Sequence, residues 1–329
     1  RVFYYFYPMS AQAMNEKVID PIDSSLLLEE LTKDIFVRPT NNASNEIYIF
    51  KGDEKPNLMK EVGRLREVTF RAAGGGTGKS IDVDEFDGGP YSYSQLIVWD
   101  PSEKAIVGGY RIVLCKDTLD SNGHFHLSTT EIFDFSQKLK TDYFPHTIEL
   151  GRSFVQPEFQ PSAGSRKGLF SLDNLWDGLG ALVAMHPEMK YFFGKITMYT
   201  DFNREARDTI LRFMHHYFPD NEHLVSIQSP IQLEYDCADF LGKLEGLDYK
   251  EGHKLLNTRV RELGENIPPL FNNYMNLSAT MKTFGTAVNN HFGDSEETGI
   301  MVTIADIFQP KIDRYVLPYL DYLKSQPTK

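Results

Sequence analysis

The pattern of apolar and polar residues divides the chain into alternating strands and helices. Apolar runs of strand length, rich in β-branched and aromatic residues, predict strands at residues 47–50, 94–100, 105–115, 147–155, 191–199, 224–233 and 299–307. Apolar residues at three- and four-residue spacing predict helices at residues 24–36, 57–70, 171–185, 203–218, 248–263 and 268–281. We expect Asn57 to be the N-cap of the second helix and residues 94–115 to form a hairpin around the Pro101–Ser102 turn.

The order of these elements predicts one mixed α/β (α+β) unit. Neither an internal repeat nor a Gly/Ser-rich linker divides the chain. We expect a central mixed β-sheet flanked by helices. Residues 1–56 would form an N-terminal extension, residues 57–240 the core, and residues 241–329 a helical C-terminal extension that completes the same unit.

Composition narrows the classes of function. The chain has 329 residues, a hydrophobic fraction of 41% and a formal net charge of -12, which disfavours nucleic-acid binding because phosphates require a basic surface. Its two cysteines, Cys115 and Cys237, are far apart and lack the spacing of a zinc or disulfide framework. Without an apolar run of about 18 residues, the sequence predicts a cytoplasmic protein. We expect the aromatic run at residues 3–7 to pack onto the domain.

A glycine-rich segment at residues 73–80 satisfies the loose pattern of a nucleotide phosphate loop. That loop requires a strand before it and a helix after it, but here a helix precedes the glycines. Four carboxylates follow within residues 81–88 and would repel a polyphosphate. We therefore expect a mobile loop that closes over a substrate. A nucleotide-binding switch is an alternative, and it requires ATP or GTP affinity that is lost on Lys79→Ala.

Charged residues lie within apolar segments at several places in the first half of the chain. Arg66 and Phe70 share one helix face, and Glu149 and Arg152 lie in a strand that is otherwise apolar. Burying ions without partners is costly. We therefore expect one cleft shared by three arginines and three carboxylates, namely Arg66, Arg111, Arg152, Asp84, Asp87 and Glu149. The histidine pairs at 124/126 and 215/216 lack carboxylates at ligand spacing, so no metal site is predicted.

The order of these motifs resembles a known family. The motifs are R-x-x-x-F at Arg66, D-x-x-D at Asp84, VGGYR ending at Arg111 and ELGR beginning at Glu149. This order resembles the acyl-chain branch of the GNAT superfamily, which contains acyl-homoserine-lactone synthases and hemolysin-like N-acyltransferases of the ornithine-lipid and glycine-lipid type. The resemblance covers about residues 57–307 and implies a GNAT-like fold. Glycines at 74–78, where lactone synthases have a tryptophan, favour the lipid-forming branch.

The resemblance implies the substrates. The coenzyme A loop of ordinary GNAT acetyltransferases is present only at residues 160–165, with a proline and without the final small residue. This favours acyl-phosphopantetheine on acyl carrier protein as donor of a 3-hydroxylated acyl chain, with no bound cofactor. The acceptor would be the α-amine of an amino acid in aminolipid biosynthesis, with transient contact at the inner membrane surface. An acyl-CoA-dependent enzyme and a noncatalytic acyl-binding or carrier-binding protein are the alternatives.

Amide formation from a thioester assigns a role to each candidate residue. Glu149 would be the base, directly or through a water, with Asp84 and Asp87 attracting the ammonium and sharing the proton. A β-bulge would bring Arg152 to the face of Glu149 and free the amides near Phe154 and Val155 for the thioester oxygen. Two further arginines, Arg66 and Arg111, would bind the acceptor or brace the acidic pair. Phe70 and Phe133 would line the acyl tunnel. The carrier protein would bind to six basic residues, namely Arg166, Lys167, Lys195, Arg204, Arg207 and Arg212. Ordinary core positions for the phenylalanines and a solvated helix face for residues 204–212 are the alternatives.

Overall fold

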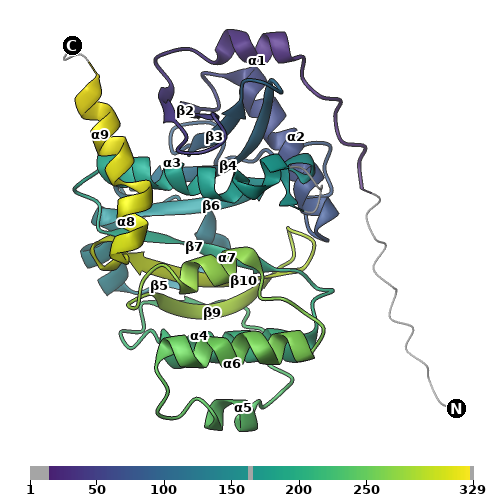
Figure 1. Cartoon of the computed structure of the whole chain (residues 1–329), viewed down its shortest axis with the longest axis vertical. Coiled ribbons are helices and arrows are strands. Elements are labelled where there is room, and N and C mark those ends of the chain that lie inside the picture. The colour runs from purple at the N-terminus through teal and green to yellow at the C-terminus, as the bar shows by residue number, and fades with distance from the viewer. Residues whose placement is uncertain (1–14, 162–165, 327–329) are drawn as a thin grey trace, which may run out of the picture.

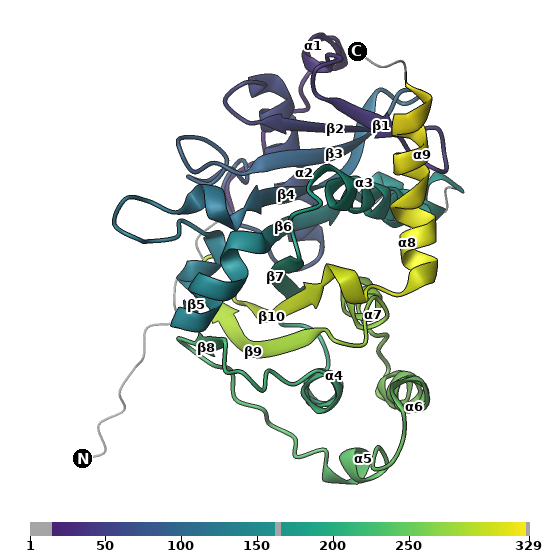
Figure 2. The same cartoon turned by 90° about the vertical axis from the view of Figure 1, so that its left-hand side faces the viewer.

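The computed structural model describes residues 15–161 and 166–326, without the side chains of Arg166 and Lys167. Eight strands form one sheet in the order β1-β2-β3-β4-β6-β7-β10-β9, and Figure 2 shows this order from one end of the molecule to the other. The strands of the large sheet are β1 (Phe36–Pro39), β2 (Glu46–Lys51), β3 (Ser94–Asp100), β4 (Ala105–Leu114), β6 (Thr147–Val155), β7 (Tyr191–Met198), β9 (Lys282–Asn289) and β10 (Ser295–Thr303). A second sheet pairs β5 (Phe133–Phe135) with β8 (Val225–Ile227).

Helices cover both faces of the large sheet (Figure 1). They are α1 (Ser24–Glu30), α2 (Pro56–Ala72), α3 (Ser171–Met185), α4 (Arg204–Tyr217), α5 (Ala238–Gly242), α6 (Tyr249–Glu262), α7 (Pro269–Met275), α8 (Gln309–Tyr315) and α9 (Leu317–Ser325). Consecutive residues of a strand point to opposite faces. Accordingly, Leu96 and Val98 of β3 enter the core that contains α3, whereas Ile97 and Trp99 enter the core that contains α2.

The sheet is antiparallel except where β6 and β7 run parallel. These two strands pair only from Thr147 to Leu150 on β6 and from Tyr191 to Gly194 on β7. Both strands continue beyond this point, to Val155 and Met198, without pairing with each other. The sheet therefore divides at its centre, while β4 and β10 support the outer edges of the two diverging strands.

The predicted mixed sheet with flanking helices is confirmed. Residues 241–329 are not purely helical, because β9 and β10 complete the large sheet. Within this part, α7 ends at Met275 instead of 281, and β10 begins at Ser295 instead of 299. The predicted strand at 224–233 shortens to the three residues of β8. Strands β1 and β9 were not predicted, because neither segment shows regular alternation and pairing within the sheet decides their conformation.

The prediction that Asn57 caps α2 is wrong. Pro56 is already the first helical residue, so Asn57 lies inside the helix. The carboxylate of Glu30 in α1 accepts hydrogen bonds from the backbone N–H groups of Asn57 (3.0 Å) and Leu58 (2.8 Å). A residue distant in sequence thus satisfies the free amides at the helix start.

Two predicted features lie outside the described residues: the aromatic run at 3–7 and most of the segment at 160–165. Across the described parts of the chain, the helices fall short of the length and apolarity needed to cross a bilayer.

Candidate active site

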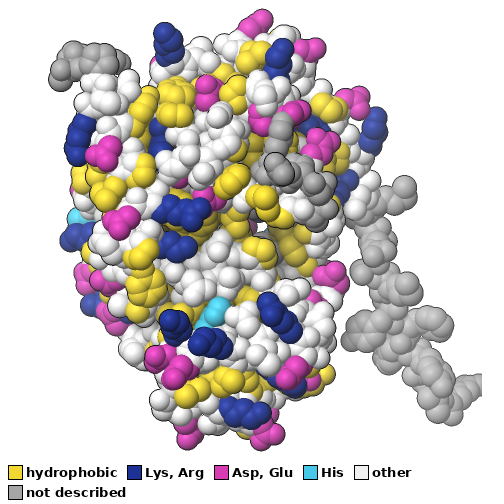
Figure 3. Space-filling view, in the orientation of Figure 1, with side chains coloured by type: hydrophobic (Ala, Val, Ile, Leu, Met, Phe, Trp, Pro, Cys, Tyr) yellow, Lys and Arg dark blue, Asp and Glu magenta, His cyan; other side chains and the backbone are white. Residues whose placement is uncertain are grey.

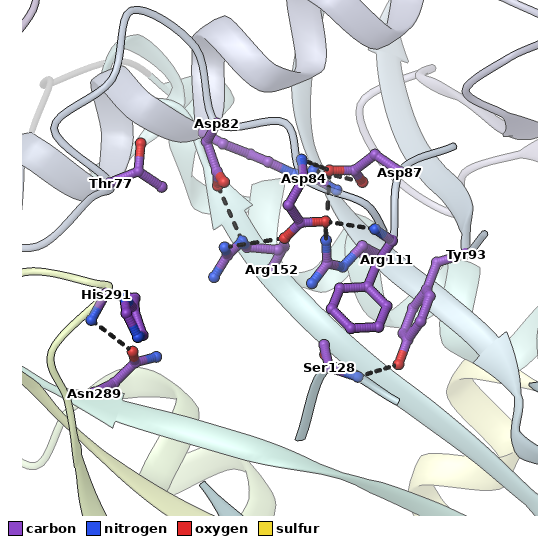
Figure 4. A network of polar contacts seen from close by, with 12 residues as sticks. Thr77, Asp82, Asp84, Asp87, Tyr93, Arg111, Ser128, Arg152, Asn289 and His291 are labelled. Atoms are coloured by element: carbon purple, nitrogen blue, oxygen red, sulfur yellow. Dashed lines mark hydrogen bonds and ion pairs between the residues drawn. The ribbon is translucent and has the colours of Figure 1, made fainter. Parts of the chain in front are cut away.

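Two arginines and two aspartates form a largely buried ionic cluster, and Figure 4 shows its members Asp84, Asp87 and Arg111. Arg66 of α2 pairs with Asp87 at 3.0 Å and also donates to the side-chain oxygen of Gln95. Arg111 of β4 pairs with Asp84 at 2.6 Å and with Asp87 at 3.4 Å. The residues of the R-x-x-x-F, D-x-x-D and VGGYR motifs therefore meet in space, because each buried ion needs a partner of opposite charge.

The ionic cluster holds Asp87 in its charged form. Burial alone would raise the pKa of this carboxyl, but the charges of Arg66 and Arg111 outweigh burial and keep the pKa well below its usual range. A carboxylate with such a low pKa does not accept a proton near neutrality. The geometry thus argues against the expected sharing of a proton by Asp87 and favours a bracing role.

A β-bulge in β6 places Arg152. Against β4, Gly151 faces Arg111 and Phe154 faces Gly109, so three steps along β6 match two along β4. Arg152 lies in this bulge with a φ of 48°, in the left-handed region that non-glycine residues rarely adopt. The bulge that we expected from sequence is present.

The guanidinium of Arg152 extends the ionic cluster. It lies 3.0 Å from Asp82 and 3.5 Å from Asp84, so that Asp84 bridges Arg111 and Arg152 (Figure 4). The guanidinium carbon also lies 4.6 Å from the ring centre of Phe292. Three arginines and three aspartates thus alternate in one series of ion pairs beside the site, and their formal charges balance.

Glu149 is bound by hydroxyl groups and is not one of the carboxylates of this ionic cluster. Its carboxylate is completely buried and accepts hydrogen bonds from three hydroxyls: Tyr93 (2.8 Å) and Ser128 (2.9 Å) at Oε1, and Thr129 (2.9 Å) at Oε2. Burial raises the pKa of Glu149, and it outweighs the opposing effects of the three hydrogen bonds and the nearby charge of Arg111. A carboxylate with a raised pKa, beside a cleft, is suited to accept a proton.

A cleft of about 1180 Å³ lies beside both groups. Asp84, Arg111, Ser128 and Arg152 line this cleft, together with the glycine-rich loop and residues 289–294. Lys195 of β7 also lines the cleft, next to the point where β6 and β7 separate. A smaller cavity of about 30 Å³ lies in that separation and shares Arg152 and Lys195 with the cleft.

The glycine-rich loop is held by Glu67 of α2. This buried carboxylate accepts hydrogen bonds from the backbone N–H groups of Thr77 (3.1 Å) and Gly78 (2.8 Å), and Arg71 pairs with it at 2.6 Å. The amides that would cradle a phosphate therefore already bind a carboxylate. A helix precedes this loop and the next strand or α-helix is β3, so the nucleotide-binding alternative is not supported.

The two phenylalanines expected in an acyl tunnel occupy core positions. Phe70 packs edge to face against Phe292, with ring centres 5.0 Å apart, and Phe133 packs near Phe193 at 6.5 Å. Both are almost completely buried. A role as tunnel wall stays a prediction, and it would require these rings to move apart. Phe154 is also buried in the core, next to Val155 at the end of β6.

The structure removes Arg207 from the expected basic landing site. Arg207 is buried and pairs with Asp208 and Glu296, each at 2.6 Å, so it cannot meet a partner protein. Arg204 pairs with the same Glu296 at 2.6 Å, and Lys195 lines the cleft. Basic side chains do gather over α6 in Figure 3, mixed with acidic ones. The side chains of Arg166 and Lys167 lie outside the described part of the chain.

Sequence reasoning missed four side chains of the site, namely Asp82, Tyr93, Ser128 and Thr129. Asp82 stands two residues before Asp84, a spacing that places both on one side of an extended segment. Ser128 and Thr129 form a short polar run between Leu127 and Ile132. Serine and threonine are so common in such runs that the sequence does not separate these hydroxyls from ordinary turn residues.

Comparison with known proteins identifies the family of the chain. A profile for the GNAT acetyltransferase domain matches residues 65–167. A glycine N(alpha)-acyltransferase of Bacteroides thetaiotaomicron is 48% identical over 307 residues, which is 93% of this chain and 91% of that protein. A glycine N(alpha)-acyltransferase of Phocaeicola vulgatus is 49% identical over 303 residues, covering 92% of this chain and 93% of that protein. No solved structure matches the chain. The chain therefore belongs to the same GNAT acyltransferase family as these two proteins, and it is an acyltransferase.

Proposed function

We propose that this enzyme joins a long acyl chain, delivered as a thioester, to the α-amine of glycine. The observation that carries the proposal is Glu149, a buried carboxylate with a raised pKa beside a large cleft. Such a group can take the proton that an amine must lose before it attacks a carbonyl. Both relatives are glycine N(alpha)-acyltransferases, which supports glycine as the acceptor.

The division between β6 and β7 is where we place the thioester. Gln156 donates its backbone N–H to Val107 of β4 at 3.0 Å. Because successive N–H groups of a strand point to alternate edges, the N–H of Val155 faces the side of β7, where pairing has ended. That amide, rather than the one of Phe154, can donate to the thioester oxygen and stabilise the negative charge that develops there.

Lys195 is our candidate for the carboxylate of glycine. Lys195 lines the cleft, and its ammonium lies 3.9 Å from Glu297, a distance too long for a hydrogen bond. Arg66 is completely buried, so it cannot reach a substrate and instead braces Asp87. Asp84, at the cleft surface, would attract the ammonium of glycine as it arrives.

For the donor we propose a 3-hydroxyacyl chain on acyl carrier protein. The support is the segment at 160–165, which departs from the coenzyme A loop, and the adjacent basic residues Arg166 and Lys167, which can attract an acidic carrier. The product would be an acylated amino acid of aminolipid biosynthesis. Its greasy chain would bring the enzyme into transient contact with the inner membrane surface.

The test is amide formation by the purified protein. Glycine or ornithine is mixed with the same 3-hydroxyacyl chain on either acyl carrier protein or CoA, and the N-acylated amino acid is measured by mass spectrometry. We expect product with the carrier-protein thioester, much less with the CoA thioester, and a preference for glycine over ornithine. Turnover with CoA alone would overturn the proposed donor. Acyl-chain binding without any amide product would show a noncatalytic binding protein.

A further inference from the structure

Glu149 is separated from the cleft by hydroxyl side chains. Its carboxylate has no solvent-exposed surface. Of the three hydroxyl residues that bind it, Ser128 lines the cleft, whereas Tyr93 and Thr129 do not. A substrate amine in the cleft would therefore meet the hydroxyl of Ser128 before it could approach Glu149 (Figure 4 shows Ser128 next to Tyr93).

Tyr93 fixes the relative positions of Ser128 and Glu149. The backbone N–H of Ser128 donates to the Tyr93 hydroxyl oxygen at 2.8 Å, and that hydroxyl donates to Glu149 Oε1 at 2.8 Å. The Ser128 hydroxyl reaches the same Oε1 at 2.9 Å. Each donor has one acceptor in this arrangement, so Ser128 Oγ keeps its lone pairs for a donor from the cleft.

We propose that the hydroxyl of Ser128 relays the acceptor's proton to Glu149, an inference that rests on the proposed function. A proton of the glycine ammonium moves to Ser128 Oγ while the Ser128 hydroxyl proton moves to Glu149 Oε1. Glycine is left as the neutral amine, Ser128 is unchanged and Glu149 is protonated.

The remaining steps balance without another reactant. The amine nitrogen forms a bond to the carbonyl carbon, and the carbon–sulfur bond breaks with its electron pair on sulfur. The proton that nitrogen loses on becoming an amide goes to that sulfur, which leaves as a thiol. After the product departs, Glu149 returns its proton through Ser128 to water in the cleft.

The other titratable groups around Glu149 do not compete for this proton. Burial raises the pKa of the Tyr93 hydroxyl and of the Cys115 thiol well above their ordinary values, so both stay protonated near neutrality. Arg111 of β4 carries the nearby positive charge and remains charged throughout. Of these groups, Glu149 is therefore the one left to accept the proton.

The test compares two variants that each remove one hydroxyl from the same carboxylate. Ser128→Ala and Thr129→Ala both delete a 2.9 Å hydrogen bond to Glu149, but Ser128 alone of the two faces the cleft. We expect Ser128→Ala to lower kcat by about 10²-fold or more and Thr129→Ala by about tenfold or less. Equal losses would overturn the relay, because both hydroxyls would then only stabilise the carboxylate.

A second pair of variants, both at Ser128, differs only in the presence of a hydroxyl on side chains of similar shape. This pair makes the test independent of any effect of Thr129→Ala on folding. Ser128→Thr retains a hydroxyl and should recover most of the wild-type kcat, whereas Ser128→Val should not. Equal rates in these two variants would also overturn the relay. A wild-type enzyme that forms no N-acylglycine would refute the proposed function itself. Activity in the wild type with no difference between the paired variants would refute only the relay.

Discussion

Two buried carboxylates in the same site, Asp87 and Glu149, have opposite electrostatic surroundings. Asp87 lies between two arginines, and their charges keep its pKa well below the usual range. Glu149 is bound by neutral hydroxyls, and burial raises its pKa. Burial alone therefore does not define a catalytic carboxylate. The charge of its partners decides whether it braces the fold or exchanges protons.

The substitution with the largest expected effect is one that neutralises Glu149. We expect Glu149→Gln to lower kcat by about 10²- to 10⁴-fold, because the amide cannot accept a proton. The fold should persist, since the neutral amide can hydrogen-bond to the same hydroxyls. Rates of amide formation and thermal unfolding measure the two effects. Full activity of this variant at neutral pH would remove Glu149 from the mechanism.

Removing a charge from the ionic cluster should instead destabilise the protein. Arg66→Met leaves Asp87 buried with one charged partner fewer and leaves Gln95 without its donor. We expect the free energy of unfolding to fall by about 3–5 kcal/mol, measured by urea denaturation. Lys17→Ala is the control, because Lys17 pairs with Asp20 on the surface and should change stability by less than about 1 kcal/mol. Similar effects of the two substitutions would contradict a structural role for the cluster.

Deleting the hydroxyl of Tyr93 should change both the stability of the protein and the pKa of Glu149. Tyr93→Phe removes one donor to Glu149 and the acceptor of the Ser128 N–H. We expect a loss of about 1–3 kcal/mol in stability and a further rise in the pKa of Glu149, seen as a shift of the acid limb of the rate profile to higher pH. A shift to lower pH would show that the hydrogen bond favours the protonated carboxyl.

The pH dependence of stability should have opposite signs for the two carboxylates. Glu149 has a raised pKa in the folded state, so the folded protein binds more protons than the unfolded one. Its contribution to the free energy of unfolding therefore falls as the pH rises above the pKa that Glu149 has in the unfolded state. Asp87 has a lowered pKa in the folded state. Its contribution to the free energy of unfolding is therefore present above the pKa that Asp87 has in the unfolded state, and it is lost as the pH falls below that pKa.

Urea denaturation over a pH series tests these signs. Each group contributes a slope of at most about 1.4 kcal/mol per pH unit. Glu149→Gln should remove the decline toward higher pH, and Asp87→Asn should remove part of the decline toward lower pH. The same direction of change in both variants would contradict the comparison.

Sequence alone could predict the ionic cluster but not the surroundings of Glu149. Arg66 and Arg111 lie in apolar segments, and the need of buried ions for partners pairs them with Asp84 and Asp87 of the acidic stretch at residues 81–88. The same reasoning placed Glu149 among the arginines. The structure gives it hydroxyl partners instead, and the sequence does not distinguish those hydroxyls from turn residues.

Long-range pairing and helix faces account for the other differences. The pattern of Lys282–Asn289 does not alternate regularly, and its strand conformation follows from pairing with β10. Arg207 shares its helix face with Leu211 and Met214, four and seven positions on, which are buried. That spacing was a signal that Arg207 points inward, where Glu296 and Asp208 neutralise it.

The most direct test of the account is the pH dependence of kcat at saturating glycine. The acid limb of this profile reports the group that must be deprotonated in the enzyme–substrate complex. We predict an apparent pKa above the ordinary range of a glutamate in the wild-type enzyme, and no such limb in the residual activity of Glu149→Gln. An acid limb that is unchanged in Glu149→Gln would contradict the account, because another group would then accept the proton.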